Sequence, residues 1–338
     1  MKRGNIYSIK MISYKDLGFV NTREMFKEAY AGNYVIGAFN FVCLEQMQAI
    51  TAAAMETESP FIMQCSANVR KYIHPIMARH MATACIEIIR SEGLQIPMAL
   101  HLDHGTTYEE CKAAIDGGFS SVMIDGSALP FDENIELTAR VVEYAQKHDV
   151  TVEGELGVVS GIEEDIEHYE SRFTDPGAVQ EFVEKSGVDS LAISIGTSHG
   201  VVKIRVKPGE PVPPLRFDIL SEVEKRLPGF PIVLHGASAI PQKYIDMINL
   251  YGGKLDQAQG IPVEQVKQVA KTSVCKINIA SDGWITMTAT TRKVLAENPA
   301  IIDPRKFLAP ARDAMKEIYI YKMREVFGCA GKAAISGK

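Results

Sequence analysis

The feature that most constrains the fold of this 338-residue chain is a regular alternation of short apolar runs with helix-like segments. Eight β-rich runs are continuously apolar, which is typical of strands that are buried on both faces of a parallel sheet. The predicted strands span Tyr34–Phe39, Phe61–Cys65, Met98–Leu102, Ser121–Ile124, Thr151–Leu156, Ser190–Ile195, Ile232–Leu234 and Val274–Ile277. The predicted helices between them span Leu44–Glu58, Ile76–Ser91, Tyr108–Asp116, Glu133–Lys147, Ala178–Lys185, Leu215–Arg226 and Gln242–Leu250. This alternation predicts an α/β fold.

Eight is the number of strands that closes a (β/α)8 TIM barrel. A doubly wound open sheet is the alternative, but no glycine-rich dinucleotide-binding turn follows the first predicted strand. A further helix is expected at Val263–Ala270, and two more between Trp284 and Phe327. Because no linker, repeat or low-complexity tract divides the chain, residues 1–338 are predicted to form a single TIM-barrel domain. The barrel is expected over about 20–290 and a helical C-terminal extension over about 291–338.

Composition and charge narrow the class of protein. Apolar residues make up 46% and charged residues 23%, and the formal net charge of −6 argues against nucleic acid or an anionic membrane as a partner. No stretch approaches the roughly 18 uninterrupted apolar residues of a membrane span, and the first ten residues lack the apolar region of a signal peptide. The cysteines form no C-x-x-C pair, so we expect reduced thiols and a cytoplasmic location. They are Cys43, Cys65, Cys85, Cys111, Cys275 and Cys329.

Three of the predicted strands end in a histidine that is followed by glycine. His104 follows the third strand, His199 the sixth and His235 the seventh. The carboxyl ends of barrel strands are where active sites of this fold lie, and three neutral imidazoles with an open fourth position suit a catalytic zinc ion. The alternative is three unrelated, hydrogen-bonded histidines. For His101, which lies within the third strand, we favour a role in supporting the fold or in orienting a metal ligand over direct binding of the metal.

Acidic residues lie beside these histidines. Asp103 directly precedes a proposed ligand, so it is a candidate to exchange a proton with a substrate hydroxyl near the metal. Its alternative role is to orient an imidazole. After the fifth strand, glycines at 157 and 161 followed by acids predict a mobile acidic loop, which either supplies a general base or is merely solvated.

Small residues follow the seventh and eighth strands, at the corner where TIM barrels often bind phosphate. These segments are Gly236-Ala-Ser238 and Asn278-Ile-Ala-Ser281. Small side chains allow backbone N–H groups to approach an anion closely. We therefore interpret this corner as a candidate phosphate site.

Six motifs together carry a resemblance to a known family. They are His-Leu-Asp-His-Gly (101–105), Gly-Phe-Ser-Ser-Val-Met-Ile-Asp-Gly-Ser (118–127), Glu-Gly-Glu-Leu-Gly (153–157), Ser-His-Gly (198–200), Leu-His-Gly-Ala-Ser (234–238) and Lys-Ile-Asn-Ile (276–279). The set closely resembles the motifs of class II fructose-bisphosphate aldolases, and the similarity extends from about Val20 to Ala334. The fold that this resemblance implies is again the TIM barrel.

The resemblance implies Zn2+ bound by His104, His199 and His235, and reversible cleavage of fructose 1,6-bisphosphate, or a related ketose 1-phosphate, into dihydroxyacetone phosphate and an aldehyde such as glyceraldehyde 3-phosphate. Asp103 would handle the proton of the C4 hydroxyl, and Glu163 a proton at the dihydroxyacetone carbon. The implied substrate-binding residues are Asn40, Ser66, Gly200, Gly236, Ser238, Asn278, Ser281 and Asp282. A monovalent cation (Na+ or K+) near the phosphate and a homo-oligomer, dimer or tetramer, are also implied.

Departures from the family pattern cluster after the eighth strand. Ala280 stands where related enzymes usually have an aspartate that contacts substrate hydroxyls, and Trp284 stands where they usually have an arginine that clamps the distal phosphate. Ser66-Ala-Asn68 also replaces a Ser-x-Gly pattern. One interpretation is a tagatose-bisphosphate or other ketose-phosphate aldolase with a different aldehyde partner. The other is that Arg70, Arg292 or a neighbouring subunit's arginine contacts the distal phosphate.

Two rival classes remain at this point. A Schiff-base aldolase would use a barrel lysine such as Lys276, but the three histidines would then have no explanation. A non-catalytic barrel that supports a partner subunit is the other rival. The presence of Asp103, Glu163 and all three histidines argues against it.

Overall fold

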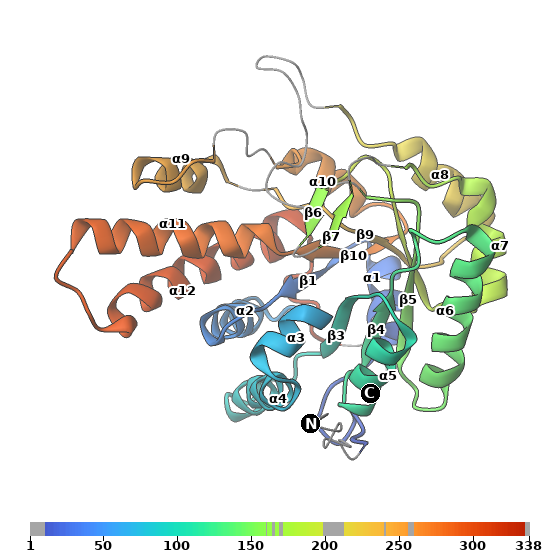
Figure 1. The fold of residues 1–338 in the computed structure, drawn as a ribbon, viewed down its shortest axis with the longest axis horizontal. Coiled ribbons are helices and arrows are strands. Elements are labelled where there is room, and N and C mark those ends of the chain that lie inside the picture. Colours follow the sequence, from blue (N-terminus) through green and yellow to red (C-terminus); the bar gives the residue numbers. More distant parts are fainter. Residues whose placement is uncertain are drawn as a thin grey trace, which may run out of the picture.

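The computed structural model describes residues 11–159, 161–163, 166–168, 172–198, 213–239, 241–255 and 260–334, with only the backbone described for 161–163 and 166–168. Eight parallel strands close into a barrel in the order β1-β10-β9-β8-β5-β4-β3-β2 (Figure 1), so the predicted TIM barrel is confirmed and the open sheet is wrong. The strands are β1 (Ile36–Asn40), β2 (Phe61–Ser66), β3 (Met98–Gly105), β4 (Ser121–Ile124), β5 (Thr151–Leu156), β8 (Ser190–Ile193), β9 (Ile232–Leu234) and β10 (Val274–Ile279).

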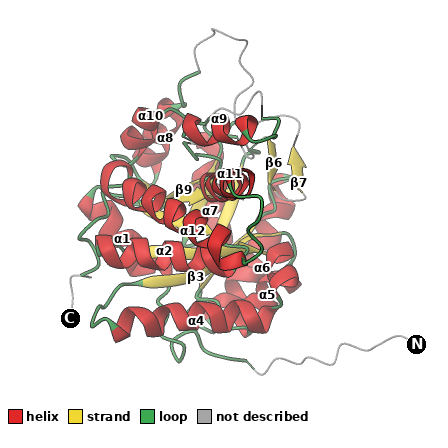
Figure 2. Cartoon of the chain, turned by 90° about the vertical axis from the view of Figure 1, so that its left-hand side faces the viewer, coloured by secondary structure: helices red, strands yellow, loops and turns green. Residues whose placement is uncertain are grey.

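Helices surround the barrel (Figure 2). They are α1 (Thr22–Gly32), α2 (Leu44–Thr57), α3 (Ala67–Ile73), α4 (Pro75–Ser91), α5 (Tyr108–Asp116), α6 (Phe131–Gln146), α7 (Pro176–Ser186), α8 (Phe217–Arg226), α9 (Gln242–Leu250), α10 (Val263–Val269), α11 (Ser281–Glu297) and α12 (Pro304–Tyr321), which continues as a π-helical turn at Lys322–Val326. All the helices expected from the sequence are present. None of the described helices is both long and apolar enough to cross a membrane.

Three elements were not predicted. Helix α1 begins at the cap residue Asn21, whose side chain accepts a hydrogen bond from the Arg23 N–H, and it buries Met25 and Phe26. Both the cap and the apolar spacing were readable in the sequence. Helix α3 is only seven residues long. The antiparallel hairpin of β6 (Gly161–Glu163) and β7 (Ile166–His168) lies where the sequence predicted a mobile acidic loop and no strands.

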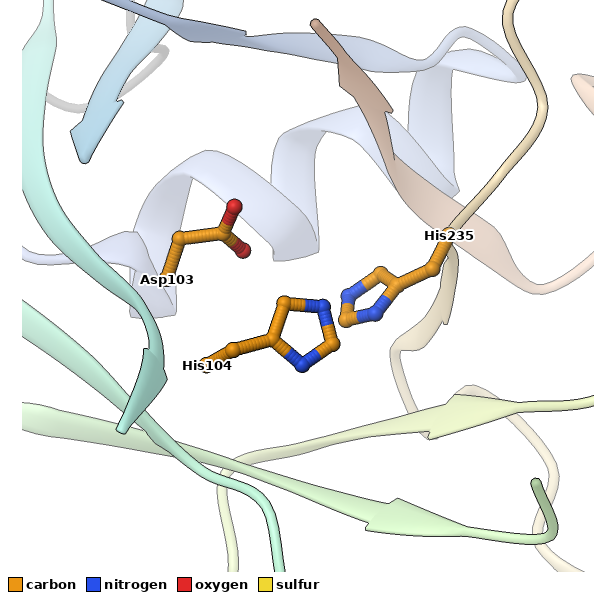
Figure 3. Close-up of side chains that lie close together, drawn as sticks. All are labelled: Asp103, His104 and His235. Atoms are coloured by element: carbon orange, nitrogen blue, oxygen red, sulfur yellow. The ribbon is translucent and has the colours of Figure 1, made fainter. Parts of the chain in front are cut away.

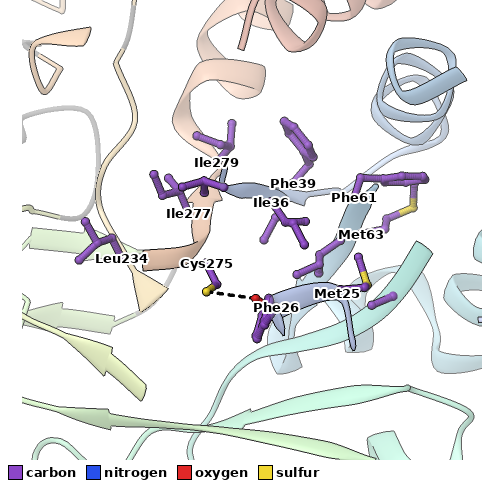
Figure 4. Packing of buried hydrophobic residues seen from close by; sticks show 14 of the residues in the cluster. Met25, Phe26, Ile36, Phe39, Phe61, Met63, Leu234, Cys275, Ile277 and Ile279 are labelled. Atoms are coloured by element: carbon purple, nitrogen blue, oxygen red, sulfur yellow. Dashed lines mark hydrogen bonds between the residues drawn. The ribbon is translucent and has the colours of Figure 1, made fainter. Parts of the chain in front are cut away.

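The barrel strands are apolar on their outer side, where they pack against the helices. Phe26 of α1 lies beside β10, and the Cys275 thiol donates a hydrogen bond to its carbonyl oxygen at 3.5 Å (Figure 4). Burying a side chain of this size contributes about 1.5–3 kcal/mol, which helps to hold α1 against β10 and β1. All six cysteines are free, as expected from their spacing.

The helices after the barrel form an arm that projects from its side (Figure 1). Helices α11 and α12 pack against each other, and α12 also packs against α2. The Tyr319 ring of α12 meets Phe39 of β1 edge to face, with ring centroids 4.9 Å apart. At the base of the arm, Lys322 pairs with Asp282 at 3.0 Å, and both side chains are buried. A buried ion pair therefore joins the end of α12 to the first turn of α11, which directly follows β10.

Candidate active site

Strand β3 ends in an unusual backbone conformation that determines what its side chains face. Adjacent residues on a strand normally point to opposite sides. Here the pairing of β3 with β4 shifts register between Leu102 and Gly105, and His104 has a φ of 42°, in the left-handed region. The irregularity turns His104 so that it and Asp103 border the same space (Figure 3). Strain of this kind at a non-glycine residue is typical of functional sites.

His235 approaches from β9, on the other side of this space. The rings of His104 and His235 lie with centroids 4.6 Å apart, at an interplanar angle of 67°. One potential ligand atom from each of Asp103, His104 and His235 lies within 4.8 Å of the others (Figure 3). The structure thus brings together two of the three predicted metal ligands and the predicted proton carrier. The third predicted ligand, His199, lies outside the described residues.

Each imidazole is backed by a carboxylate, partly buried behind His104 and fully buried behind His235. Nδ1 of His104 lies 2.9 Å from Oδ2 of Asp125, and Nε2 of His235 lies 3.0 Å from Oε1 of Glu153. Because an ionised carboxylate only accepts hydrogen bonds, these contacts place the ring protons on those nitrogens. The other nitrogens, Nε2 of His104 and Nδ1 of His235, then carry the lone pairs, and these are the atoms that could bind a metal. Carboxylate–histidine pairs of this kind are the usual support of zinc ligands, so the donor set fits zinc.

Three amide side chains hold the Asp103 carboxylate. Nδ2 of Asn40 donates to Oδ2 at 2.8 Å, Nε2 of Gln64 donates to the same oxygen at 3.2 Å, and Nδ2 of Asn278 donates to Oδ1 at 2.9 Å. They come from β1, β2 and β10, so the closed barrel is needed to assemble them. Gln64 was not predicted. The signal for it is a glutamine inside an otherwise apolar run, in register with Asn40.

Beneath these groups lies a layer of buried charge. The ammonium of Lys276 is 2.8 Å from Oε2 of Glu153 and 3.1 Å from Nε2 of His101, whose Nδ1 is 2.9 Å from Ser121 Oγ. Burial would raise the pKa of Glu153, but the Lys276 charge and the His235 hydrogen bond outweigh it and lower that pKa. Burial and the Lys276 charge lower the pKa of His101 well below 6.5.

The position of Lys276 disfavours the Schiff-base alternative. Its side chain is fully buried and ion-paired with Glu153, whereas a Schiff-base lysine must meet the substrate carbonyl as a free amine. The sequence offered a signal for this layer. On β3, β5 and β10, polar residues occur two apart (101 and 103, 153 and 155, 276 and 278), which places both members of each pair on one face of their strand.

The other residues that the sequence predicted to bind substrate or move protons lie in several different places. Asn278 donates to the Asp103 carboxylate, Gly236 directly follows His235, and Ser238 is buried three residues after His235. Ser66 caps α3, where its hydroxyl accepts a hydrogen bond from the Val69 N–H.

The structure does not bring Asp282 to the Asp103 cluster, because this buried side chain pairs with Lys322; its neighbour Ser281 opens α11 and is also buried. Glu163 belongs to β6, of which the structure describes only the backbone. Gly200 lies outside the described residues.

Comparison with known proteins identifies the family. Residues 20–332 match the model of the class II fructose-bisphosphate aldolases. Fructose-bisphosphate aldolase of Treponema pallidum is 53% identical over 332 residues, covering 96% of this chain and 100% of the relative, and that of Giardia intestinalis is 44% identical, covering 92% and 93%. The solved structure of the YdjI aldolase from Escherichia coli K12 superimposes with a TM-score of 0.72 at 27% identity, covering 94% of this chain and 100% of that one. The chain therefore belongs to the class II fructose-bisphosphate aldolase family.

Proposed function

We propose that this aldolase is a zinc enzyme that reversibly cleaves fructose 1,6-bisphosphate into dihydroxyacetone phosphate and glyceraldehyde 3-phosphate. The observation that carries the proposal is the convergence of Asp103, His104 and His235 at the carboxyl ends of β3 and β9, with a carboxylate behind each imidazole. The choice of substrate is supported by the names of relatives that are 53% and 44% identical. Those names do not favour a different aldehyde partner or a non-catalytic barrel.

In this proposal His104, His199 and His235 hold the zinc ion. When bound, the metal polarises the ketone oxygen of the sugar and stabilises the negative charge that develops there. Nε2 of His104 and Nδ1 of His235 are the ligand atoms, because the other nitrogen of each ring is hydrogen-bonded to a carboxylate.

The protein's own groups move the protons. Asp103 takes the proton of the C4 hydroxyl during cleavage and returns it during condensation, and its three amide partners fix the direction of its oxygens. Glu163, on the hairpin that follows β5, exchanges a proton at the dihydroxyacetone carbon. The 1-phosphate binds at residues that follow β8 and β9 and at residues in and just after β10, beside a monovalent cation. These are Gly200, Gly236, Ser238, Asn278 and Ser281.

The distal phosphate needs a different cation from the one that relatives usually carry in α11. Arg70 donates to the Ala113 carbonyl oxygen at 2.7 Å and stacks over Phe119, so α5 and the turn before β4 already engage it. Arg292 donates to the Tyr251 carbonyl oxygen at 3.3 Å. We therefore propose that an arginine of a second subunit contacts this phosphate in a homo-oligomer. We further propose one domain over residues 1–338 and a cytoplasmic location.

The test is a steady-state comparison on zinc-loaded protein. Cleavage of fructose 1,6-bisphosphate, tagatose 1,6-bisphosphate and the two 1-phosphates is measured by coupling the release of dihydroxyacetone phosphate to its reduction. We expect the highest kcat/KM for fructose 1,6-bisphosphate. A higher value for another ketose phosphate would refute the substrate, and full activity after treatment with EDTA would refute the role of the metal.

A further inference from the structure

The metal-facing side chains rest on a second polar layer, formed by Lys276, Glu153 and His101. The three side chains lie inside the barrel and come from β10, β5 and β3, and each is at most 1% exposed. Burying an ammonium and a carboxylate is costly unless both are paired and hydrogen-bonded. The chemistry proposed above gives Lys276 and His101 no role, so their presence at the centre of the barrel calls for one.

The hydrogen bonds of Lys276 have only one possible direction. An ammonium carries three N–H donors and no acceptor. Nε2 of His101, 3.1 Å from Nζ, must therefore accept, and the ring proton must lie on Nδ1, 2.9 Å from the Ser121 hydroxyl. The same ammonium donates to Oε2 of Glu153 at 2.8 Å. His101 is thus a neutral acceptor for Lys276.

The donor and acceptor assigned at Glu153 also determine the tautomer of His235 in the candidate metal site. With Oε2 engaged by Lys276, Oε1 of Glu153 accepts from Nε2 of His235 at 3.0 Å. A proton fixed on Nε2 leaves the lone pair on Nδ1, the only ring nitrogen of His235 then able to bind a metal. Without the ammonium, Glu153 would be a fully buried carboxylate with no lysine charge beside it, and its ionised form, which can only accept from His235, would be disfavoured.

We propose that Lys276 is a positioning residue that acts through Glu153 to fix His235 in its metal-binding tautomer, and that His101 is the second acceptor that holds the ammonium in place. This inference rests on the metal centre proposed above. The competing explanation is that the three side chains only fill and stabilise the barrel. The positioning role predicts specific histidine tautomers and a loss of metal affinity when Lys276 is replaced. A purely structural role predicts only a loss of stability.

The first test is spectroscopic and uses the wild-type protein. Long-range proton–nitrogen correlation spectra of metal-free protein labelled with 15N-histidine report which ring nitrogen carries the proton. We expect His101 to be protonated on Nδ1 and His235 on Nε2, with signals assigned from the spectra of His101→Gln and His235→Gln. A proton on Nε2 of His101 would overturn the proposal, whether or not any variant folds.

The second test measures zinc affinity by competition with a chromophoric chelator. Loss of a group that orients a metal-bound histidine typically weakens binding 10- to 100-fold, and we expect a loss of about this size for Lys276→Met. Lys322→Met is the matched control, because it breaks a buried lysine–carboxylate pair of the same chemistry, with Asp282 as the partner. It should lower stability but leave zinc affinity within about twofold of wild type.

A double variant tests whether Lys276 acts through Glu153. If it does, Lys276→Met in the Glu153→Gln background should weaken zinc binding little further. A folded Lys276→Met protein with wild-type zinc affinity, or an additive loss in the double variant, would refute the inference alone. Wild-type protein that binds no zinc would instead refute the proposed metal centre, and the histidine tautomers of the metal-free protein would still be read independently.

Discussion

Replacing Gly236 by alanine should damage the active site more than it damages the fold. Gly236 directly follows His235 and has a φ of 62°, where an alanine costs roughly 1–2 kcal/mol. A Cβ atom at this position would also lie 2.5 Å from the backbone oxygen of Ser198 and 2.6 Å from its carbonyl carbon. Both atoms belong to the backbone, so no side-chain rotation relieves the contact.

The size of the effect follows from that contact. Ordinary van der Waals contact begins at 3.4 Å, so the Ser198 segment and Gly236 must separate by about 0.9 Å. Overpacking of this kind costs about 1–3 kcal/mol, which gives a total loss of about 2–5 kcal/mol in the free energy of unfolding. A displacement of about 1 Å at a catalytic group can cost about 100-fold in rate, so we expect kcat to fall by about that factor.

Gly252→Ala is the matched control. Gly252, after α9, has a φ of 86°, and a Cβ there would meet nothing within 4 Å. The Gly252→Ala variant should lose only about 1–2 kcal/mol of the free energy of unfolding, which is the cost of an alanine in the left-handed conformation, and it should keep full activity. Urea unfolding of both metal-free variants and steady-state cleavage by their zinc-loaded forms make the comparison. If Gly236→Ala loses no more stability than Gly252→Ala and retains wild-type kcat, the steric reasoning is wrong.

Three further predictions follow from the site and the core. Asp103→Ala should lower kcat by about 10²–10⁴-fold with zinc still bound, as judged by metal analysis; a near-normal rate would show that another group moves the proton. Removal of zinc with EDTA should abolish activity and lower Tm. Zinc at about 100 times its Kd should restore about 2.7 kcal/mol to the free energy of unfolding, and an unchanged Tm would argue against binding. Burial raises the pKa of the Cys275 and Cys329 thiols to about 12, and it also raises that of Cys43, which is only partly buried. A thiol reagent should therefore titrate only Cys43 in native protein, and slowly, and all six cysteines after denaturation; reaction of more than one native thiol would contradict the packing.

The strands were predictable because their signal is local. Eight apolar runs and their helical partners can be recognised from residues that are neighbours in the chain, and the observed strands begin and end within two residues of the predicted bounds, except at the carboxyl end of β3. The start of α7 at Pro176 and its end at Gly187, with a φ of 71°, follow equally local rules. The polar end of β3 was missed because His104 and Gly105 continue the strand only through a register shift with β4.

The partners of the candidate site residues could not be predicted in the same way. Lys276 and His101 are 175 positions apart, as are Asn278 and Asp103, and they meet only because β1 pairs with β10 and closes the barrel. Which of two adjacent side chains faces the site depends on register, and a shift of one residue would reverse it.

By itself the sequence determined the barrel, the carboxyl-end position of its histidines and a likeness to one aldolase family, because hydrophobic periodicity and short motifs are properties of neighbouring residues. The tertiary structure decided that Asp103 and His104 border one space, since this depends on the left-handed backbone at His104. It also decided that the buried Asp282 carboxylate pairs with Lys322. Only strand closure could assemble the amides around Asp103 and the buried charges beneath His235, because each of these groups is stable in the interior only when all its partners are present.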